Sequence, residues 1–180
     1  MILIYDYGVG NLYSVRKAFE RIGAEVRIGK DLENADAVVL PGVGNYSAVS
    51  GVKLPNVPVL GICLGMQLLL EKSEEGGKGF GLVPGRVVRF PDGVKRPQMG
   101  WNEVESDGRL LKGKAYFYFA NSYYCKPEKG SVGWTDYGVR FCSILEYKNL
   151  FGVQFHPEKS GEQGLQVLRN FVREAERWKR

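Results

Sequence analysis

The sequence predicts an α/β fold: an open, mainly parallel β-sheet with flanking helices and additional antiparallel strands. In the first 70 residues, short apolar runs alternate with helical patterns, which is typical of a parallel sheet. Between residues 82 and 155, several strand candidates follow one another with turn residues between them, which indicates antiparallel strands. Near the C-terminus, apolar residues recur at helical spacing.

The first half of the sequence predicts four strands and two helices. A buried strand over residues 1–5 leads to a helix with Leu12, Val15, Phe19 and Ile22 on one face, and Gly23 ends it. We expect further strands over residues 24–28 and 37–40. After at most a short helix within residues 45–57, the stretch 57–70 predicts an apolar strand that runs into a short apolar helix.

The second half predicts strands over residues 86–90, 115–119, 140–146 and 150–155. A closing amphipathic helix would place its apolar side chains in the core, namely Leu165, Leu168, Phe171, Val172, Ala175 and Trp178. No repeat or linker divides the 180 residues, so we expect a single domain over residues 1–180.

Composition excludes several classes of protein. No leader-like segment or run of about 18 apolar residues is present, so we expect a cytoplasmic protein with no membrane partner. The three cysteines include no Cys-x-x-Cys pair, so with the single histidine they do not have the ligand spacing of a common structural zinc site. The net charge of +5 raises nucleic acid as a partner, but the basic residues are scattered among acids. A solvated helix face is favoured, and an acidic protein partner is the second interpretation.

Cys63 lies at the predicted strand-to-helix junction, in the segment Gly61-Ile62-Cys63-Leu64-Gly65. Glycines two residues before and after a nucleophile allow the sharp turn that exposes it. A helix N-terminus also favours a thiolate over a thiol. Taken alone, the pattern favours a buried structural cysteine, since free cysteines are often buried.

His156 is the only histidine, and it follows the strand candidate 150–155 directly. Pro157 biases His156 toward an extended backbone, which would direct the Glu158 side chain to the same side as the imidazole. A histidine at a strand end is usually structural. A carboxylate on one ring nitrogen, however, leaves the other to accept a thiol proton.

Cys63 and His156 would both lie at carboxyl ends of strands in one sheet, where they can converge. A thiolate with a carboxylate-backed imidazole is suited to acyl transfer from an amide. The backbone N–H of Leu64 and that of Val43, in the turn 41–44, are the candidate oxyanion donors. Taken alone, the segment 41–44 favours an ordinary turn. Two glycine-rich stretches, 8–10 and 73–79, lack the remaining residues of nucleotide-binding motifs.

Six segments, taken in order, resemble a known family over nearly the whole chain. They are Asp6-Tyr7-Gly8-Val9-Gly10-Asn11-Leu12, Pro41-Gly42-Val43-Gly44, Gly61-Ile62-Cys63-Leu64-Gly65-Met66-Gln67, Met99-Gly100-Trp101-Asn102, Ser122-Tyr123 and Gln154-Phe155-His156-Pro157-Glu158-Lys159-Ser160. The elbow and the His-Pro-Glu segment resemble the class I (triad) glutamine amidotransferases. The other motifs resemble, within that class, the glutaminase subunits of imidazole glycerol phosphate synthase from histidine biosynthesis.

The resemblance implies a flavodoxin-like fold and hydrolysis of glutamine to glutamate and ammonia through a thioester on Cys63. His156 and Glu158 would complete the triad, and no cofactor or metal is needed. It implies glutamine binding by Gly44, Gln67, Glu75, Ser122 and Tyr123.

The resemblance also implies a partner, a (β/α)8-barrel cyclase subunit that forms a heterodimer with this chain and receives its ammonia. The residues expected to face it are Asn11, Pro97, Gln98, Met99, Trp101 and Lys159. Core packing is the alternative for Met99 and Trp101.

Two features depart from the family pattern. The segment between Gly44 and Gly61 is shorter than expected, and Gln98 and Asn121 stand where the family often has histidine. Three other functions remain open: a glutaminase of another synthase such as pyridoxal phosphate synthase, a non-catalytic scaffold subunit, and a cysteine peptidase with the same triad.

Overall fold

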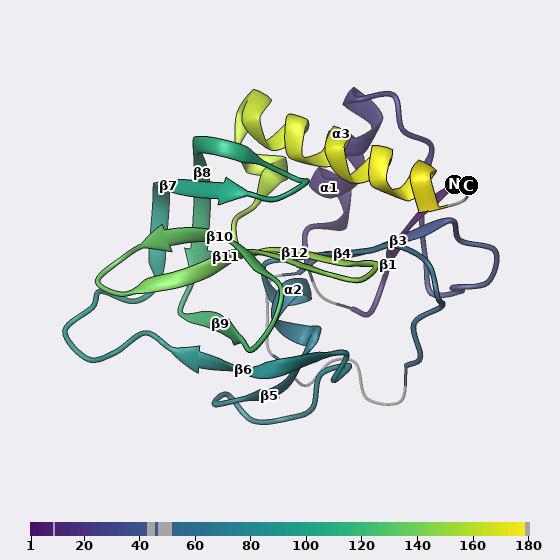
Figure 1. Cartoon of the computed structure of the whole chain (residues 1–180). Helices are drawn as coiled ribbons and strands as arrows, with labels where there is room; N and C mark the ends of the chain where they lie inside the picture. The colour runs from purple at the N-terminus through teal and green to yellow at the C-terminus, as the bar shows by residue number, and fades with distance from the viewer. Residues whose placement is uncertain (9, 43–45, 47–51, 179–180) are drawn as a thin grey trace.

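The computed structural model describes residues 1–8, 10–42, 46 and 52–178. In this part of the chain, twelve strands form one sheet, and three α-helices pack on its two faces (Figure 1). The expected α/β fold is confirmed. Within the short segment 45–57, residues 45 and 47–51 lie outside the described residues, and residues 52–57 contain no helix.

Five parallel strands form one half of the sheet, in the order β2-β1-β3-β4-β12. They are β1 (Ile2–Tyr5), β2 (Val26–Gly29), β3 (Ala37–Leu40), β4 (Val59–Ile62) and β12 (Leu150–Val153). Their apolar runs suit strands that are covered on both faces. Each lies within two residues of the predicted bounds.

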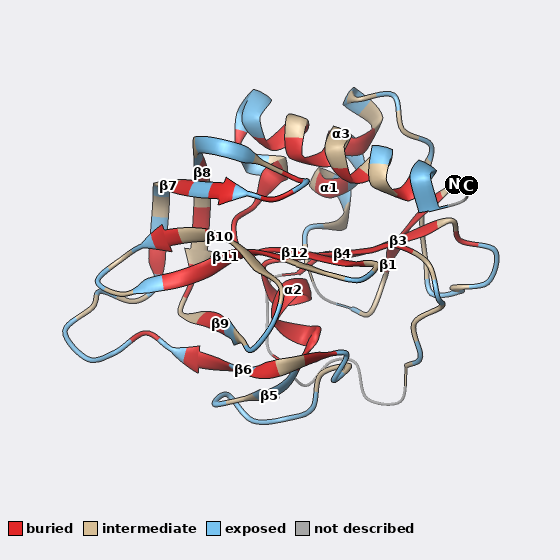
Figure 2. Cartoon of the chain, in the orientation of Figure 1, coloured by how far each residue is buried: buried red, intermediate tan, exposed pale blue. Residues whose placement is uncertain are grey.

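The two faces of this parallel half carry different layers. Ile2 and Ile4 of β1 belong to the hydrophobic cluster that includes Phe19 of α1 (Leu12–Arg21) and Phe171 of α3 (Gly161–Trp178). Leu3 belongs to the opposite cluster, together with residues of the short helix α2 (Leu64–Leu68). Figure 2 shows the strands buried, with α1 and α3 exposed on their outer sides and α2 buried throughout.

Antiparallel strands continue the sheet beyond β12, in the order β11-β10-β7-β8. A smaller group, β5-β6-β9, attaches through the pairing of β9 with β11. The bounds are β5 Leu70–Ser73, β6 Val83–Arg89, β7 Gln98–Asp107, β8 Lys112–Asn121, β9 Tyr123–Pro127, β10 Ser131–Asp136 and β11 Arg140–Tyr147. Strands β5, β7, β9 and β10 were not expected from the sequence.

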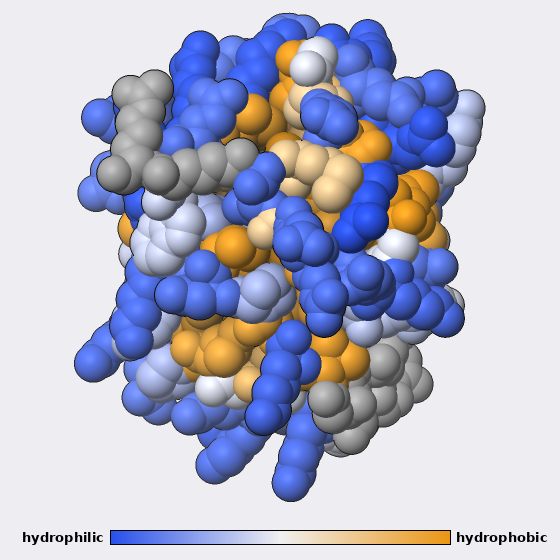
Figure 3. Space-filling model, turned by 90° about the vertical axis from the view of Figure 1, so that its right-hand side faces the viewer, coloured by the Kyte–Doolittle hydropathy of each residue, from blue (hydrophilic) through white to orange (hydrophobic). Residues whose placement is uncertain are grey.

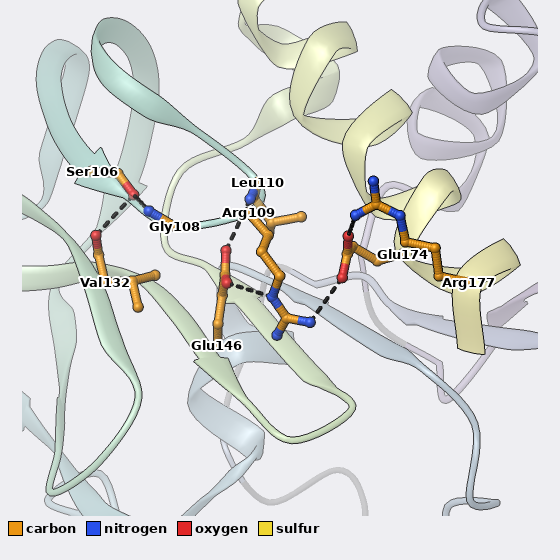
Figure 4. Close-up of polar contacts among 8 residues, drawn as sticks. All are labelled: Ser106, Gly108, Arg109, Leu110, Val132, Glu146, Glu174 and Arg177. Carbon is orange, nitrogen blue, oxygen red and sulfur yellow. Dashed lines mark hydrogen bonds and ion pairs between the residues drawn. The ribbon is translucent and has the colours of Figure 1, made fainter.

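An ion-pair network ties the β7–β8 hairpin to β11 and to α3 (Figure 4). Arg109 donates from Nε to Glu146 at 3.0 Å and from Nη1 to Glu174 at 2.8 Å. Arg177 donates to the second oxygen of Glu174 at 2.6 Å. The other Glu146 oxygen accepts the backbone N–H of Leu110 at 2.9 Å. The network therefore joins three elements that are far apart in sequence.

The C-terminal helix α3 differs from the prediction at its end. Leu165, Leu168, Phe171 and Ala175 are buried and Val172 is half-buried, but Trp178 is 48% exposed. The prediction of Trp178 as a core residue is therefore wrong, because its side chain lies on a surface groove beside Pro58 and Lys148.

On the side of the molecule that carries the N-terminus, hydrophilic residues cover most of the surface and hydrophobic residues show between them (Figure 3). A groove of about 290 Å³ between β1, α1 and α3 is lined by residues such as Met1, Ile22 and Val172. Its lining contains no Cys, Ser, Thr, Lys or His side chain. None of the helices in the described part of the chain is long and apolar enough to span a membrane.

Candidate active site

Cys63 lies between β4 and α2 in a strained backbone conformation, with φ 52° and ψ −106°. Positive φ is uncommon for a residue other than glycine and is typical of functional turns. The two flanking glycines allow this turn, because a Cβ at either position would clash with the neighbouring backbone. A Cβ on Gly61 would lie 2.5 Å from the backbone of Gly65, and one on Gly65 would lie 1.9 Å from the carbonyl oxygen of Leu40. The segment thus forms the sharp elbow that the sequence predicts.

His156 and Glu158 form a buried pair at the end of β12. Nδ1 of His156 lies 2.9 Å from Oε1 of Glu158, and both side chains are at most 3% exposed. Because a carboxylate only accepts, Nδ1 carries the proton in this bond. The expected extended backbone is present at His156, with φ −100° and ψ 95°, while Glu158 belongs to a 3-10 turn, Pro157–Lys159.

Ser160 holds the backbone of this turn. Its hydroxyl donates to the carbonyl of His156 at 2.6 Å and accepts the N–H of Tyr118 at 3.0 Å. The N–H of His156 donates in turn to the carbonyl of Tyr118 at 2.9 Å. The imidazole is therefore fixed against β8, and sequence reasoning gave Ser160 no role.

Cys63 and His156 converge because β4 and β12 are parallel neighbours. The N–H of Cys63 donates to the carbonyl of Val153 at 2.8 Å, three residues before His156. Burial lowers the pKa of His156, but interactions with the Cys63 thiol and the Glu158 carboxylate raise it by more, to about 10. Nε2 of His156 is buried and makes no hydrogen bond with the described residues. It is the nitrogen left to exchange a proton with the thiol.

A pocket of about 250 Å³ opens beside Cys63. Four residues predicted to bind substrate line it, namely Gln67, Glu75, Ser122 and Tyr123, together with Cys63, Leu64, Pro97, Ala120 and Asn121. The fifth, Gly44, lies outside the described residues. The Gln67 amide is already oriented, because Nε2 donates to the carbonyl of Tyr123 and to Gln154, each at 3.1 Å. The Glu75 carboxylate accepts the N–H of Tyr46 at 3.0 Å.

The structure describes only one of the two expected oxyanion donors, the backbone N–H of Leu64. Leu64 is the first residue of α2, so its N–H has no acceptor within the helix. Val43 lies outside the described residues. The turn that leads to Val43 is held by Tyr7, whose hydroxyl donates to the carbonyl of Pro41. Burial, and then the proximity of the Cys63 thiol, raise the pKa of Tyr7.

Three groups near the thiol were not singled out from the sequence. Gln154 is fully buried, and its Nε2 donates to the Cys63 sulfur at 3.5 Å. The carbonyl oxygen of Ala120 lies 3.9 Å from the same sulfur. Tyr7 is the third. A glutamine between the apolar residues of a buried strand end was the available signal for Gln154. A backbone carbonyl leaves no signal in a sequence.

Most of the residues expected to face a partner are exposed. Met99 is 66% exposed and Trp101 57% exposed, which excludes core packing for both. Asn11, Pro97 and Lys159 are exposed as well. Gln98 is the exception. It is only 2% exposed because it begins β7 with its side chain turned inward, so it does not lie on the surface.

Comparisons with known proteins agree with this geometry. The family model described as "Glutamine amidotransferase class-I" matches residues 3–175. The chain is 49% identical to imidazole glycerol phosphate synthase subunit HisH of Methanothermobacter thermautotrophicus, over 96% of this chain and 98% of that protein. It is 47% identical to the subunit HisH of Archaeoglobus fulgidus and 46% identical to that of Moorella thermoacetica. The latter two matches cover 96% and 94% of this chain, and 98% and 93% of those proteins.

Solved structures show the same fold at lower sequence identity. One glutamine amidotransferase superposes with a TM-score of 0.76 at 16% identity, covering 98% of this chain and 100% of that one. Another glutamine amidotransferase, from Thermotoga maritima, gives a TM-score of 0.63 at 19% identity, covering 99% of this chain and 84% of that one.

Proposed function

The chain belongs to the class I glutamine amidotransferase family and, within it, to the HisH subunits of imidazole glycerol phosphate synthase, and from this premise we propose that Cys63, His156 and Glu158 are its catalytic triad. The enzyme hydrolyses glutamine to glutamate and ammonia. The observation that carries the triad is the placement of Cys63 at a strained elbow next to the strand that ends in the buried His156–Glu158 pair.

The proposed reaction begins with attack of the Cys63 sulfur on the side-chain amide carbon of glutamine. The thiol proton passes to Nε2 of His156, and the N–H of Leu64, with that of Val43, stabilises the oxyanion. When the C–N bond breaks, His156 returns the proton to the leaving nitrogen, and ammonia departs from a thioester. Water then attacks the thioester, His156 accepts its proton, and glutamate and the Cys63 thiol are released.

Glu158 fixes the tautomer that this proton transfer needs. Since Nδ1–H is committed to the carboxylate, Nε2 is the free nitrogen. The raised pKa of His156 makes its imidazole a stronger base toward the thiol proton. We place the glutamine in the pocket of about 250 Å³, among Gln67, Glu75, Ser122 and Tyr123, and we propose Gly44 as a further substrate-binding residue.

As part of a synthase, the chain acts with a partner protein. We propose that this partner is a (β/α)8-barrel cyclase that forms a heterodimer with the chain in the cytoplasm and consumes the ammonia. The exposed Met99 and Trp101 on β7 and the exposed Lys159 support a docking face at this end of the molecule. Large exposed apolar side chains on one strand are typical of such a face.

The experiment is to measure ammonia release from glutamine by the chain alone, and then with the cyclase and its nucleotide ligand. Cys63→Ala serves as the blank. Cys142→Ala is the matched control, because it removes another buried thiol that lies outside the pocket. We expect activity in the wild type and the control and none in Cys63→Ala. Turnover by Cys63→Ala at the wild-type rate would overturn the assignment of the nucleophile.

A further inference from the structure

Gln154 is a fully buried amide side chain that follows β12 and contacts the nucleophile directly. Its Nε2 donates to the Cys63 sulfur at 3.5 Å. Its backbone N–H donates to the carbonyl of Ser143 at 3.0 Å, which holds the residue against β11. The reaction described above uses this sulfur as the attacking atom, but it gives the amide that donates to the sulfur no part.

Two neighbouring hydrogen bonds decide which end of the Gln154 amide faces the sulfur. The Tyr123 carbonyl can only accept, so the Gln67 atom that lies 3.1 Å from it is the donor Nε2. The same Nε2 lies 3.1 Å from the Gln154 amide and needs an acceptor there. Oε1 of Gln154 is that acceptor, and its Nε2 is therefore left facing Cys63.

This orientation matters because an acceptor and a donor have opposite effects on a thiol. An acceptor favours the protonated form, and the Ala120 carbonyl, 3.9 Å from the Cys63 sulfur, is such an acceptor. A donor favours the thiolate, because an N–H bond to a charged acceptor is stronger than one to a neutral acceptor. Of these two contacts, the Gln154 amide is the one that stabilises the charge formed when the proton passes to His156.

We propose that Gln154 is a further catalytic residue, whose N–H holds the Cys63 sulfur and stabilises its thiolate, and that Gln67 is the positioning residue that orients it. The inference rests on the proposed function, because it takes Cys63 as the attacking group. Gln67 also lines the pocket of about 250 Å³. One side chain thus borders the proposed substrate site and orients the donor on the nucleophile.

The test follows the ionisation of the Cys63 thiol, because the thiolate is the form that reacts with iodoacetamide. Mass spectrometry of the Cys63 peptide gives the alkylation rate over a range of pH. This peptide is distinguished from those of the buried Cys125 and Cys142. The midpoint, at which alkylation reaches half of its plateau rate, does not depend on the plateau rate itself. The measurement needs neither glutamine nor the partner protein.

We expect Gln154→Met to raise this midpoint by about one pH unit, the effect of losing one hydrogen bond to a charged acceptor. At a given pH below both midpoints, alkylation should slow about tenfold. Gln98→Met is the matched control. It makes the same substitution at another buried glutamine, which is 2% exposed and lies outside the pocket lining. Its midpoint should equal that of the wild type.

Gln67→Met tests the positioning role. It leaves the Gln154 amide free to turn either end toward the sulfur, so the midpoint should rise by less than in Gln154→Met. In the double variant Gln67→Met should add nothing, because the amide that Gln67 orients is already absent. Additive shifts would overturn the positioning role of Gln67.

Circular dichroism identifies the variants that fold. A folded Gln154→Met variant with a wild-type midpoint would overturn the inference and leave the proposed function intact. If Gln154→Met does not fold, Gln67→Met decides: a raised midpoint supports the inference, and an unchanged one refutes it. Absence of glutamine hydrolysis by the wild type with its partner would refute the proposed function, whatever the alkylation midpoints.

Discussion

At the scale of single residues, the position of the Cys63 nucleophile depends on the absence of side chains at the neighbouring glycines. Cys63 can hold a positive φ only because the side chains of Gly61 and Gly65 are missing from the space that the Leu40 carbonyl and the α2 backbone occupy. The strain at Cys63 is small relative to the packing that imposes it. The reactive geometry is therefore a property of the elbow as a whole.

We expect Gly65→Ala to destabilise the chain by about 3 kcal/mol or more, because its Cβ would lie 1.9 Å from a backbone oxygen that has no room to move. Urea denaturation measures the loss. Gly29→Ala is the control, because a Cβ there meets only Leu3 at an ordinary 3.6 Å. Equal stability of the two variants would show that the elbow is not rigidly packed.

Glu158→Gln tests the proposed orientation of the imidazole. The substituted amide can donate to Nδ1 and so favour the wrong tautomer, while the shape of the side chain is kept. We expect kcat for glutamine hydrolysis to fall about 10²- to 10⁴-fold with KM little changed. Steady-state kinetics give both numbers. A variant within threefold of the wild-type kcat would remove Glu158 from the mechanism.

The sequence was most informative at these residues. The glycine spacing around Cys63, and Pro157 between His156 and Glu158, are local features with a steric cause, and the geometry agrees with both. Gln154, Tyr7 and the Ala120 carbonyl contact the site through tertiary packing, which local spacing does not encode. The inward orientation of Gln98 depends likewise on its partner strand β8.

At the scale of elements, the fully buried strands β1, β3, β4 and β12 were all predicted, whereas the partly exposed strands β5, β7, β9 and β10 were not. The β3 run Ala37–Leu40 is entirely apolar and was located to the residue. Strand β7 carries Gln98, Asn102 and several acidic residues, and its buried positions alternate with exposed ones only in part. Its strand character depends on the ten-residue pairing with β8, which no local pattern shows.

The link between the β7–β8 hairpin and α3 provides a prediction at this scale. Glu146→Ala would leave the Leu110 N–H without its acceptor and Arg109 with only Glu174. Since the Glu146 side chain is only 4% exposed, we expect a loss of about 1–3 kcal/mol in the free energy of unfolding. Glu103→Ala removes an ion pair with Lys114 on the open surface and should leave the denaturation midpoint unchanged. An equal effect of both variants would contradict a buried link.

At the scale of the whole molecule, the site lies where the sheet changes from parallel to antiparallel strand pairing. Strand β12 is parallel to β4 on one side and antiparallel to β11 on the other. The parallel side supplies Cys63 and His156 at neighbouring carboxyl ends, as expected for open α/β sheets. The end of β8 lies next to these carboxyl ends. It contributes Ala120 and Asn121 to the pocket, and its Tyr118 carbonyl accepts the N–H of His156. The antiparallel extension therefore completes the pocket that the parallel half begins.

The pH dependence of global stability tests whether His156 is charged in the fold. Its pKa is raised from 6.5 to about 10, so the folded chain binds a proton that the unfolded chain releases. This contribution is fully present below pH 6.5 and is lost as the pH rises toward 10. We expect the free energy of unfolding to fall between pH 6.5 and 8.5 by on the order of 1 kcal/mol per pH unit.

Urea denaturation across this pH range measures the slope, and His156→Gln should abolish it. Cys63→Ala should reduce it, because the thiol is part of what raises the pKa of His156. The buried thiols Cys125 and Cys142 also have raised pKa values. They add a loss of stability only where an unfolded thiol begins to ionise, at about pH 8.5 and above. A slope below pH 8.5 that survives in His156→Gln would mean that a group other than His156 binds the proton.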